Sequence, residues 1–284
     1  MSKGLGVLQR QDELDADAFA EHLSGDPAQA AKAILSAARQ GLVDAQAMLG
    51  QLLLDGRGIQ RDPALAVTWF QIAARQGHAM AHNMLGRCLE HGWAGAADLP
   101  KAAEHYRHAA DAGLDWGQYN LANLLATGRG VLRDPPQAFA LYRRAAAQGH
   151  AKSMNLVGRF FEEGQAVMRD LPLAHDWYRR SAEAGDFRGQ FSHAAVLAER
   201  GETEAALAWL QQALQCGNLN FLRVARHSLQ QAPQPELQAL ARDYFQRAAE
   251  LGDDTDRELY VALGARNAPY DFSANETTEH NATP

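Results

Sequence analysis

The chain has 284 residues, of which 46% are hydrophobic, 21% charged and 8% aromatic, a composition typical of a globular protein with a large apolar core. Its 27 Lys and Arg residues against 34 Asp and Glu residues give a formal net charge of −7, which argues against nucleic-acid binding. No apolar run approaches the roughly 18 residues of a membrane-spanning helix, and the polar stretch Gln9–Glu13 is unlike a secretory signal. We therefore expect a cytoplasmic protein without a membrane partner.

A period of 36 residues organises the chain. Glycines and aspartates recur at this spacing, a third column holds only small residues, and a fourth is aromatic throughout. The columns are Gly41, Gly77, Gly113, Gly149 and Gly185; Asp26, Asp62, Asp98, Asp134 and Asp170; Ala45, Ala81, Gly117, Ser153 and Gly189; and Phe70, Tyr106, Tyr142 and Tyr178. Four such columns indicate tandem copies of one structural unit.

Residues 1–41 are predicted to form an N-terminal segment with capping helices. Asp26-Pro27 is typical of a helix start, and the helix that follows ends before Gly41. It carries Ala33-Ile34 where later units have an aromatic pair, and Phe19 is placed on a preceding helix.

The first complete unit is predicted to be a pair of antiparallel helices. Residues 45–54 have small or apolar side chains at the 3.6-residue period of an amphipathic helix, which we name helix A. The glycines of Gly56-Arg57-Gly58 end helix A, because glycine readily adopts the positive φ found after a helix C-terminus. Asp62-Pro63 then starts helix B, which runs to Gly77.

The unit pattern closely resembles the Sel1-like repeat, a relative of the tetratricopeptide repeat. The residues that carry the resemblance are Ala45, Leu49, Gly50, Leu52, Leu53, Gly56, Gly58, Ile59, Asp62, Ala66, Trp69, Phe70, Ala73, Ala74 and Gly77. The resemblance implies an all-α fold, a right-handed α/α superhelix (solenoid) of helix-turn-helix repeats, with helix A on the concave side. Residues 42–185 are assigned to four 36-residue repeats, two of which, at Gly92–Gly95 and Gly164–Val167, keep only part of the double-glycine loop.

The pattern decays towards the C-terminus. Residues 186–252 are predicted to form two degenerate repeats, the first with Gly201-Glu202 in place of the full loop and the second with Tyr244-Phe245 in the aromatic columns. Residues 253–266 are expected to form a C-terminal capping helix, and residues 267–284 a disordered tail.

The sequence offers little that predicts a reaction centre. It contains no nucleophile elbow, phosphate-binding loop or dinucleotide fingerprint, so we predict a protein that is not an enzyme and needs no cofactor. His78 with His82, or His105 with His108, could present two imidazoles from one helix, but neither pair has a third ligand at a helical spacing, so no metal site is predicted. His78 and His150 lie in a Gln-Gly-His-Ala stretch that the Sel1-like pattern shares.

Two cysteines, Cys88 and Cys216, are too few for a disulfide scaffold, and both are interpreted as buried thiols. Some cysteine-rich Sel1-like proteins are linked to β-lactam binding, but this chain lacks their cysteines.

The predicted binding surface is a concave groove lined by side chains of helix A that point away from the core. Its predicted residues are Asn83, Arg87, Glu90, Tyr119, Asn123, Asn155, Arg159, Glu162 and Phe191. The amides of Asn83, Asn123 and Asn155 can both donate to and accept from an extended peptide backbone. Tyr119 and Phe191 are the expected apolar anchors, since aromatic side chains often dominate binding energy at interfaces.

These features favour a non-catalytic cytoplasmic scaffold or adaptor that binds a protein or peptide segment in the groove. One alternative is a small-ligand binder or enzyme that uses the groove as a pocket, which requires convergent polar groups shielded from water. A second alternative is a structural protein that associates with itself as a homo-oligomer.

Overall fold

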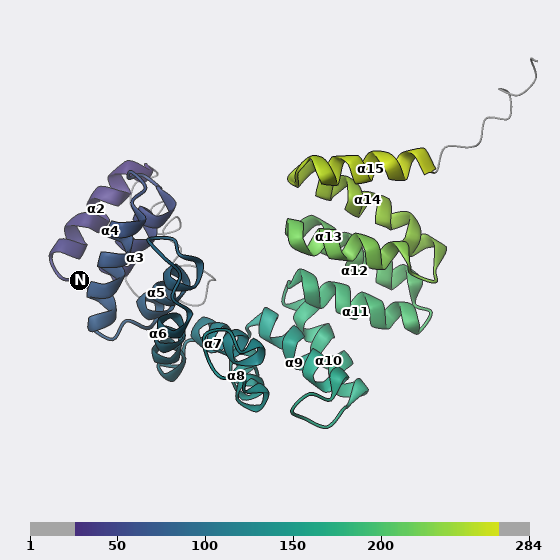
Figure 1. The fold of residues 1–284 in the computed structure, drawn as a ribbon, viewed down its shortest axis with the longest axis horizontal. Helices are drawn as coiled ribbons and strands as arrows, with labels where there is room; N and C mark the ends of the chain where they lie inside the picture. Colours follow the sequence, from purple (N-terminus) through teal and green to yellow (C-terminus); the bar gives the residue numbers. More distant parts are fainter. Residues whose placement is uncertain (1–25, 267–284) are drawn as a thin grey trace, which may run out of the picture. The chain divides into compact units, whose positions relative to one another are not determined.

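The computed structural model describes residues 26–266, and every regular element among them is an α-helix (Figure 1). The chain divides into two compact units, residues 1–184 (unit 1) and residues 185–284 (unit 2). Unit 1 contains α2 (Pro27–Arg39), α3 (Val43–Asp55), α4 (Pro63–Arg75), α5 (Ala79–His91), α6 (Leu99–Asp111), α7 (Asp115–Thr127), α8 (Pro135–Ala147), α9 (Ala151–Glu163) and α10 (Leu171–Glu183). Unit 2 contains α11 (Phe187–Glu199), α12 (Thr203–Cys216), α13 (Leu219–Gln230), α14 (Pro235–Leu251) and α15 (Asp254–Arg266). The predictions for Phe19 and for residues 267–284 lie outside the described residues.

The aspartate and glycine columns set the helix boundaries of unit 1. The Asp62 carboxylate accepts a hydrogen bond from the backbone N–H of Leu65 at 2.9 Å, and Asp98, Asp134 and Asp170 cap α6, α8 and α10 in the same way. The glycines end helix A. Gly56 follows the last residue of α3 and adopts a left-handed conformation with φ 77°, which terminates this helix. Both signals are local in sequence, which is why they could be recognised from it.

Successive helices pack in pairs, and the pairs stack within each unit. In unit 1, α3 packs on α4, α5 on α6, α7 on α8 and α9 on α10, and the pairs are joined by packing of α4 on α5, α6 on α7 and α8 on α9. Two helices of the A type, α5 and α7, also contact each other directly. The predicted all-α fold of stacked helix-turn-helix repeats is thereby confirmed.

A column of glycines on helix A makes room for the aromatic column on helix B. A Cβ atom added to Gly86 would lie 2.5 Å from the Tyr106 ring, and one added to Gly158 would lie 2.6 Å from the Tyr178 ring. Tyr106 and Tyr178 are almost completely buried. Close approach of backbone to ring therefore lets one large side chain fill the space between two helices.

The apolar face of helix B also predicts well-buried side chains at Trp69 and Trp177, and both this prediction and the one for the two cysteines need correction. Trp69 and Trp177 pack against the core but are only half-buried, whereas their neighbours Phe70 and Tyr178 are fully enclosed. Cys88 is buried as predicted, and burial raises its pKa to about 11, but Cys216 is exposed. Cys216 is the last residue of α12 and therefore lies where the helix leaves the packed core.

Unit 2 keeps the paired packing with altered connections. Residues 200–202 connect α11 to α12, whereas residues 56–62 connect α3 to α4. The Tyr244 hydroxyl donates to the backbone carbonyl of Leu210 at 2.7 Å, so the aromatic column is retained with a different acceptor. Among residues 26–266, none of the helices combines the length and the hydropathy needed to cross a bilayer.

Candidate functional site

The side chains of α5, α7 and α9 that point away from the paired helix B form one surface, which we call the helix-A face of unit 1, whereas residues 45–54 of α3 are all buried. Among the predicted groove residues on it, Asn83 and Asn155 are buried, Arg87, Glu90, Tyr119 and Asn123 are half-buried, and Arg159 and Glu162 are exposed. The ninth predicted residue, Phe191, is half-buried on α11 in unit 2, where its ring lies 5.6 Å from that of Phe221. The open part of the face is thus centred on α7 and its two neighbours.

The asparagine column contributes to packing inside the chain. Asn83 is only 2% exposed, and its Oδ1 accepts a hydrogen bond from Asn120 Nδ2 at 2.9 Å, which links α5 to α7. Asn155 is 4% exposed, and within the described part of the chain its Oδ1 has no hydrogen-bond partner. Neither amide faces solvent, so their capture of a peptide backbone stays a prediction.

Two glutamates of the face accept hydrogen bonds from the tyrosines of helix B. The Tyr106 hydroxyl donates to Glu90 Oε2 at 2.7 Å, and the Tyr178 hydroxyl donates to Glu162 Oε2 at 2.6 Å. Burial is the main cause that raises the pKa of both phenols, so they remain protonated donors. Glu90 and Glu162 therefore satisfy buried hydroxyl groups that would otherwise lack a partner.

In the other two repeats, the residue on helix A also depends on whether helix B carries a buried hydroxyl group. In the third repeat the equivalent of Glu90 is Ala126, and the Tyr142 hydroxyl instead donates to Asn123 Oδ1 at 2.7 Å. In the first repeat the aromatic residue is Phe70, which has no hydroxyl, and the equivalent position is Leu54. A polar residue thus occurs on this face where a buried hydroxyl needs it.

A loop of the next repeat also engages Glu90. Arg129, which follows the C-terminus of α7, places its Nη1 3.1 Å from Glu90 Oε1. The Glu90 side chain is 13% exposed, so the pair is partly shielded from solvent. These two residues are 39 apart, and the contact between repeats was not predicted from their spacing.

Aromatic side chains cluster at the start of α7. The Trp116 ring lies 5.7 Å from that of Tyr119 and meets the His150 ring edge to face at 4.5 Å. Lys152 Nζ lies 4.5 Å from the centre of the Trp116 ring, within the range of a cation–π interaction. Sequence reasoning identified Tyr119 but missed Trp116 and Lys152, whose only signal was an aromatic and a basic residue at equivalent positions of consecutive repeats.

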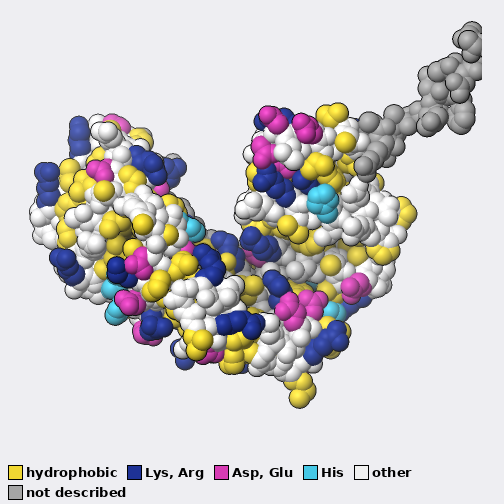
Figure 2. Space-filling view, viewed as in Figure 1, with side chains coloured by type: hydrophobic (Ala, Val, Ile, Leu, Met, Phe, Trp, Pro, Cys, Tyr) yellow, Lys and Arg dark blue, Asp and Glu magenta, His cyan; other side chains and the backbone are white. Residues whose placement is uncertain are grey.

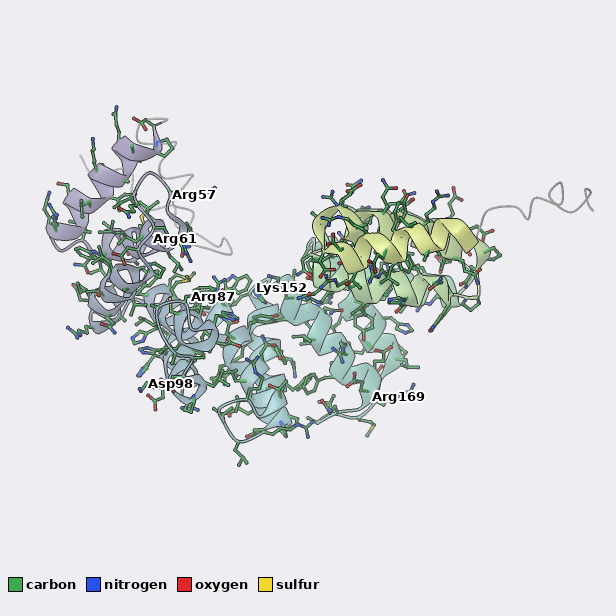
Figure 3. The ribbon with its side chains drawn as sticks, turned by 45° about the horizontal axis from the view of Figure 1, so that its top comes forward. Arg57, Arg61, Arg87, Asp98, Lys152 and Arg169 are labelled. Atoms are coloured by element: carbon green, nitrogen blue, oxygen red, sulfur yellow. The ribbon has the colours of Figure 1, made fainter. Side chains whose placement is uncertain are left out.

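Two basic side chains of the face, Arg87 and Lys152, lie on the same side of unit 1. Figure 2 shows Lys and Arg side chains along the upper margin of unit 1, over α5 to α9. In Figure 3, Arg87 and Lys152 both lie on this upper side, whereas Asp98 and Arg169 lie on the lower side of the unit. The helix-A face therefore combines aromatic, amide and cationic groups suited to binding a polypeptide.

The histidines of the Gln-Gly-His-Ala stretch cap helix A. His78 Nδ1 accepts from the backbone N–H of Ala81 at 3.0 Å, and His150 Nδ1 accepts from that of Ser153 at 3.2 Å. Each imidazole must be unprotonated at Nδ1 to act as an acceptor, so the cap requires the neutral ring. This explains why the two histidines occur at the first position of a repeat.

Three other histidines of unit 1, His82, His105 and His108, form a separate cluster. His82 Nδ1 and His105 Nδ1 are 3.1 Å apart, and the His108 ring lies 4.7 Å from that of His82. Desolvation is the largest cause that lowers the pKa of His82 and His105, and nearby imidazoles lower it further. In residues 26–266, no three His, Cys, Asp or Glu residues are arranged to hold a metal ion.

Acidification should destabilise unit 1 through His150. Its ring is 5% exposed, and burial is the main cause that lowers its pKa to about 4. Between about pH 6.5 and 4 the unfolded chain binds a proton at His150 and the folded chain does not, so stability falls with pH by roughly 2 kcal/mol. Urea unfolding at pH 7 and pH 4.5 should show this loss, and His150→Asn, which retains a capping oxygen, should show a smaller one. An equal loss in both proteins would contradict the assignment.

Comparison with known proteins identifies the repeat. A family model of the Sel1 repeat matches residues 43–78, 79–114, 117–150, 151–186, 199–218 and 229–253, which together make up more than half of the chain. A comparison with curated proteins found no match.

Two solved structures share the fold. A Sel1 repeat protein from Oxalobacter formigenes is 26% identical, with a TM-score of 0.71 over 81% of this chain and 94% of that one. The protein c5321, a protective antigen of uropathogenic Escherichia coli with an SLR fold, is 27% identical, with a TM-score of 0.63 over 85% of this chain. The match covers 53% of the E. coli protein, so this chain corresponds to about half of that protein's length.

Proposed function

Because the chain belongs to the Sel1 repeat family, we propose that it is a non-catalytic scaffold or adaptor that binds a segment of another protein on the helix-A face of unit 1. The observation that supports this proposal most is the half-buried aromatic cluster of Trp116 and Tyr119 on α7, flanked by Arg87 and Lys152. Half-buried aromatic residues provide apolar contact area that is already ordered before a partner binds. The proposal includes a cytoplasmic location, in keeping with a chain that contains only two cysteines.

Repeat architecture supplies the physical basis for this function. Each helix pair buries its apolar side against the neighbouring pairs, so the helix-A face is held by a rigid core. A rigid face loses little conformational entropy on binding, which favours affinity for a flexible segment. The contacts of Glu90 and Glu162 with the tyrosines fix the edges of this face.

Photo-crosslinking tests the location of binding. We expect p-benzoyl-phenylalanine in place of Tyr119 to crosslink the same discrete protein in repeated experiments in the native host. The matched control carries the same residue in place of Arg143, which is exposed on α8, a helix B of the same unit. Equal crosslinking from both positions, or none from position 119, would contradict binding on the helix-A face.

A further inference from the structure

Three histidines of the second repeat come together from two helices. The sequence predicts no metal site, because neither pair of histidines on one helix has a third ligand at a helical spacing. In the structure, the His82 ring on α5 lies 5.3 Å from that of His105 and 4.7 Å from that of His108, both on α6. His82 and His105 are half-buried, and His108 is exposed. Packing of α5 on α6 thus supplies the third imidazole that each helix lacks.

All three histidines depart from the repeat pattern. Position 82 belongs to a column with glutamine in three other repeats, position 105 to a column of tryptophan and leucine, and position 108 to a column with no second histidine. The equivalent residues are Gln46, Gln118, Met154 and Gln190 for His82; Trp69, Leu141 and Trp177 for His105; and Ile72, Arg144 and Arg180 for His108. Helix pairs of this kind fold without histidine at these positions, so packing alone does not explain three imidazoles in one repeat.

The distance between two ring nitrogens fits a shared cation. His82 Nδ1 and His105 Nδ1 are 3.1 Å apart. Two imidazole nitrogens that each lie about 2.0–2.1 Å from one zinc ion, at a bond angle between a right angle and the tetrahedral angle, are about 2.8–3.4 Å apart. The same separation suits an N–H that one ring donates to the other, and a bound metal ion would take the place of that proton.

The surroundings of these two rings favour a bound cation. Burial is the largest cause that lowers the pKa of His82 and of His105, so both rings are neutral at pH 7, as metal ligands must be. A hydrogen bond to the backbone carbonyl of Ala74 opposes this shift at His82, and a carbonyl contact of this kind orients the imidazoles of metal sites. The nearby Glu104 carboxylate raises the pKa of His105 and would also stabilise a positive ion.

We propose that His82, His105 and His108 bind a divalent transition-metal ion of the zinc type between α5 and α6. His82 and His105 coordinate the ion through their Nδ1 atoms. The three rings as they lie do not form a three-ligand group, but His108 is exposed, and rotation of its side chain turns a third nitrogen towards the pair. Water occupies the remaining position. The ion joins α5 to α6 within the second repeat, and its binding does not depend on the proposed partner of the helix-A face.

Isothermal titration calorimetry of the full-length protein with ZnCl₂ tests the proposal. At about pH 7.5, where imidazole is neutral, we expect Zn²⁺ to bind with a micromolar dissociation constant. Zn²⁺ should also raise the midpoint of thermal unfolding, because it binds the folded chain. Mg²⁺ should not bind, since it prefers oxygen ligands. Absence of Zn²⁺ binding would overturn the proposal and leave the binding of a partner protein unaffected.

Residues from another repeat provide variants that should fold. His82→Gln and His105→Leu introduce the residues of the third repeat, so each should keep the circular dichroism spectrum and bind Zn²⁺ at least about tenfold more weakly. The matched control is His91→Gln, because His91 is exposed on α5 and stacks on Trp93 outside the cluster. It should change the affinity by less than about twofold. Full Zn²⁺ affinity in His82→Gln, or an equal loss in His91→Gln, would overturn the proposal.

The third ligand has its own test. His108→Arg introduces the residue of the third and fourth repeats at an exposed position, so it should leave the fold intact. We expect it to weaken Zn²⁺ binding severalfold, because one of three nitrogen ligands is lost. Unchanged affinity in this variant would overturn the three-histidine site.

Discussion

Gly86→Ala should lower the free energy of unfolding by about 2–3 kcal/mol, because the added methyl group overlaps the Tyr106 ring. The new Cβ would lie 2.5 Å from one ring carbon and 2.6 Å from another, and the ring is enclosed on all sides. Moving it would also break the hydrogen bond from its hydroxyl to Glu90. The clash outweighs the gain of roughly 1 kcal/mol that alanine usually brings within a helix. Thermal and urea unfolding of the variant would measure the loss.

The third repeat provides a matched control for this prediction. It has Ala122 in the glycine column, and there the tyrosine hydroxyl bonds to Asn123, one turn earlier on helix A. Ala122→Gly should therefore cost only about 1 kcal/mol, through lost helix propensity and one lost methyl contact. If Gly86→Ala is as stable as the natural chain, packing of the Tyr106 ring does not require glycine at position 86, and this explanation of the glycine column is wrong.

Asp256→Asn should destabilise unit 2 by about 3–5 kcal/mol. The Asp256 side chain is 1% exposed, and its two oxygens accept hydrogen bonds from Arg223 Nε at 3.0 Å and from Arg226 Nη1 at 2.8 Å. Arg226 is itself almost completely buried, so removing the carboxylate charge leaves a buried cation without compensation. Denaturant unfolding followed by circular dichroism should show an earlier transition.

The same helix offers an exposed ion pair as the control. Asp254, with a side chain 90% exposed, pairs with Arg257, and Asp254→Asn should change stability by less than about 0.5 kcal/mol. Hydrogen bonds from Arg223 are the main cause that lowers the pKa of Asp256 to about 2. Its stabilising contribution is therefore complete above about pH 4 and is lost as the pH falls towards 2. Equal effects of the two substitutions would contradict a structural role for the buried cluster.

The sequence was sufficient to predict features that depend on neighbouring residues. Helix N-termini at Asp62 and Asp134 and the helix end at Gly56 follow from capping groups within one turn, and the 36-residue spacing then extends them to other repeats. The buried aromatic column followed from its spacing in the same way. These signals need no knowledge of how one repeat packs on the next.

Contacts between repeats could not be predicted in this way. Asn83 was expected to be open, yet it is buried against Asn120 from the next helix A. Glu90 was assigned to partner binding, although Tyr106 and Arg129 already engage it. Each of these contacts depends on the distance and rotation between helix pairs, which a repeat period does not specify.

Hydrogen–deuterium exchange with the partner captured through Tyr119 would test the helix-A face most directly. We predict slower exchange in peptides from α5, α7 and α9 when the partner is bound, and unchanged exchange in α6 and α8, the helices B of the same repeats. Protection of α6 and α8 with none in α5, α7 and α9 would place the partner on the opposite side of unit 1 and contradict the account.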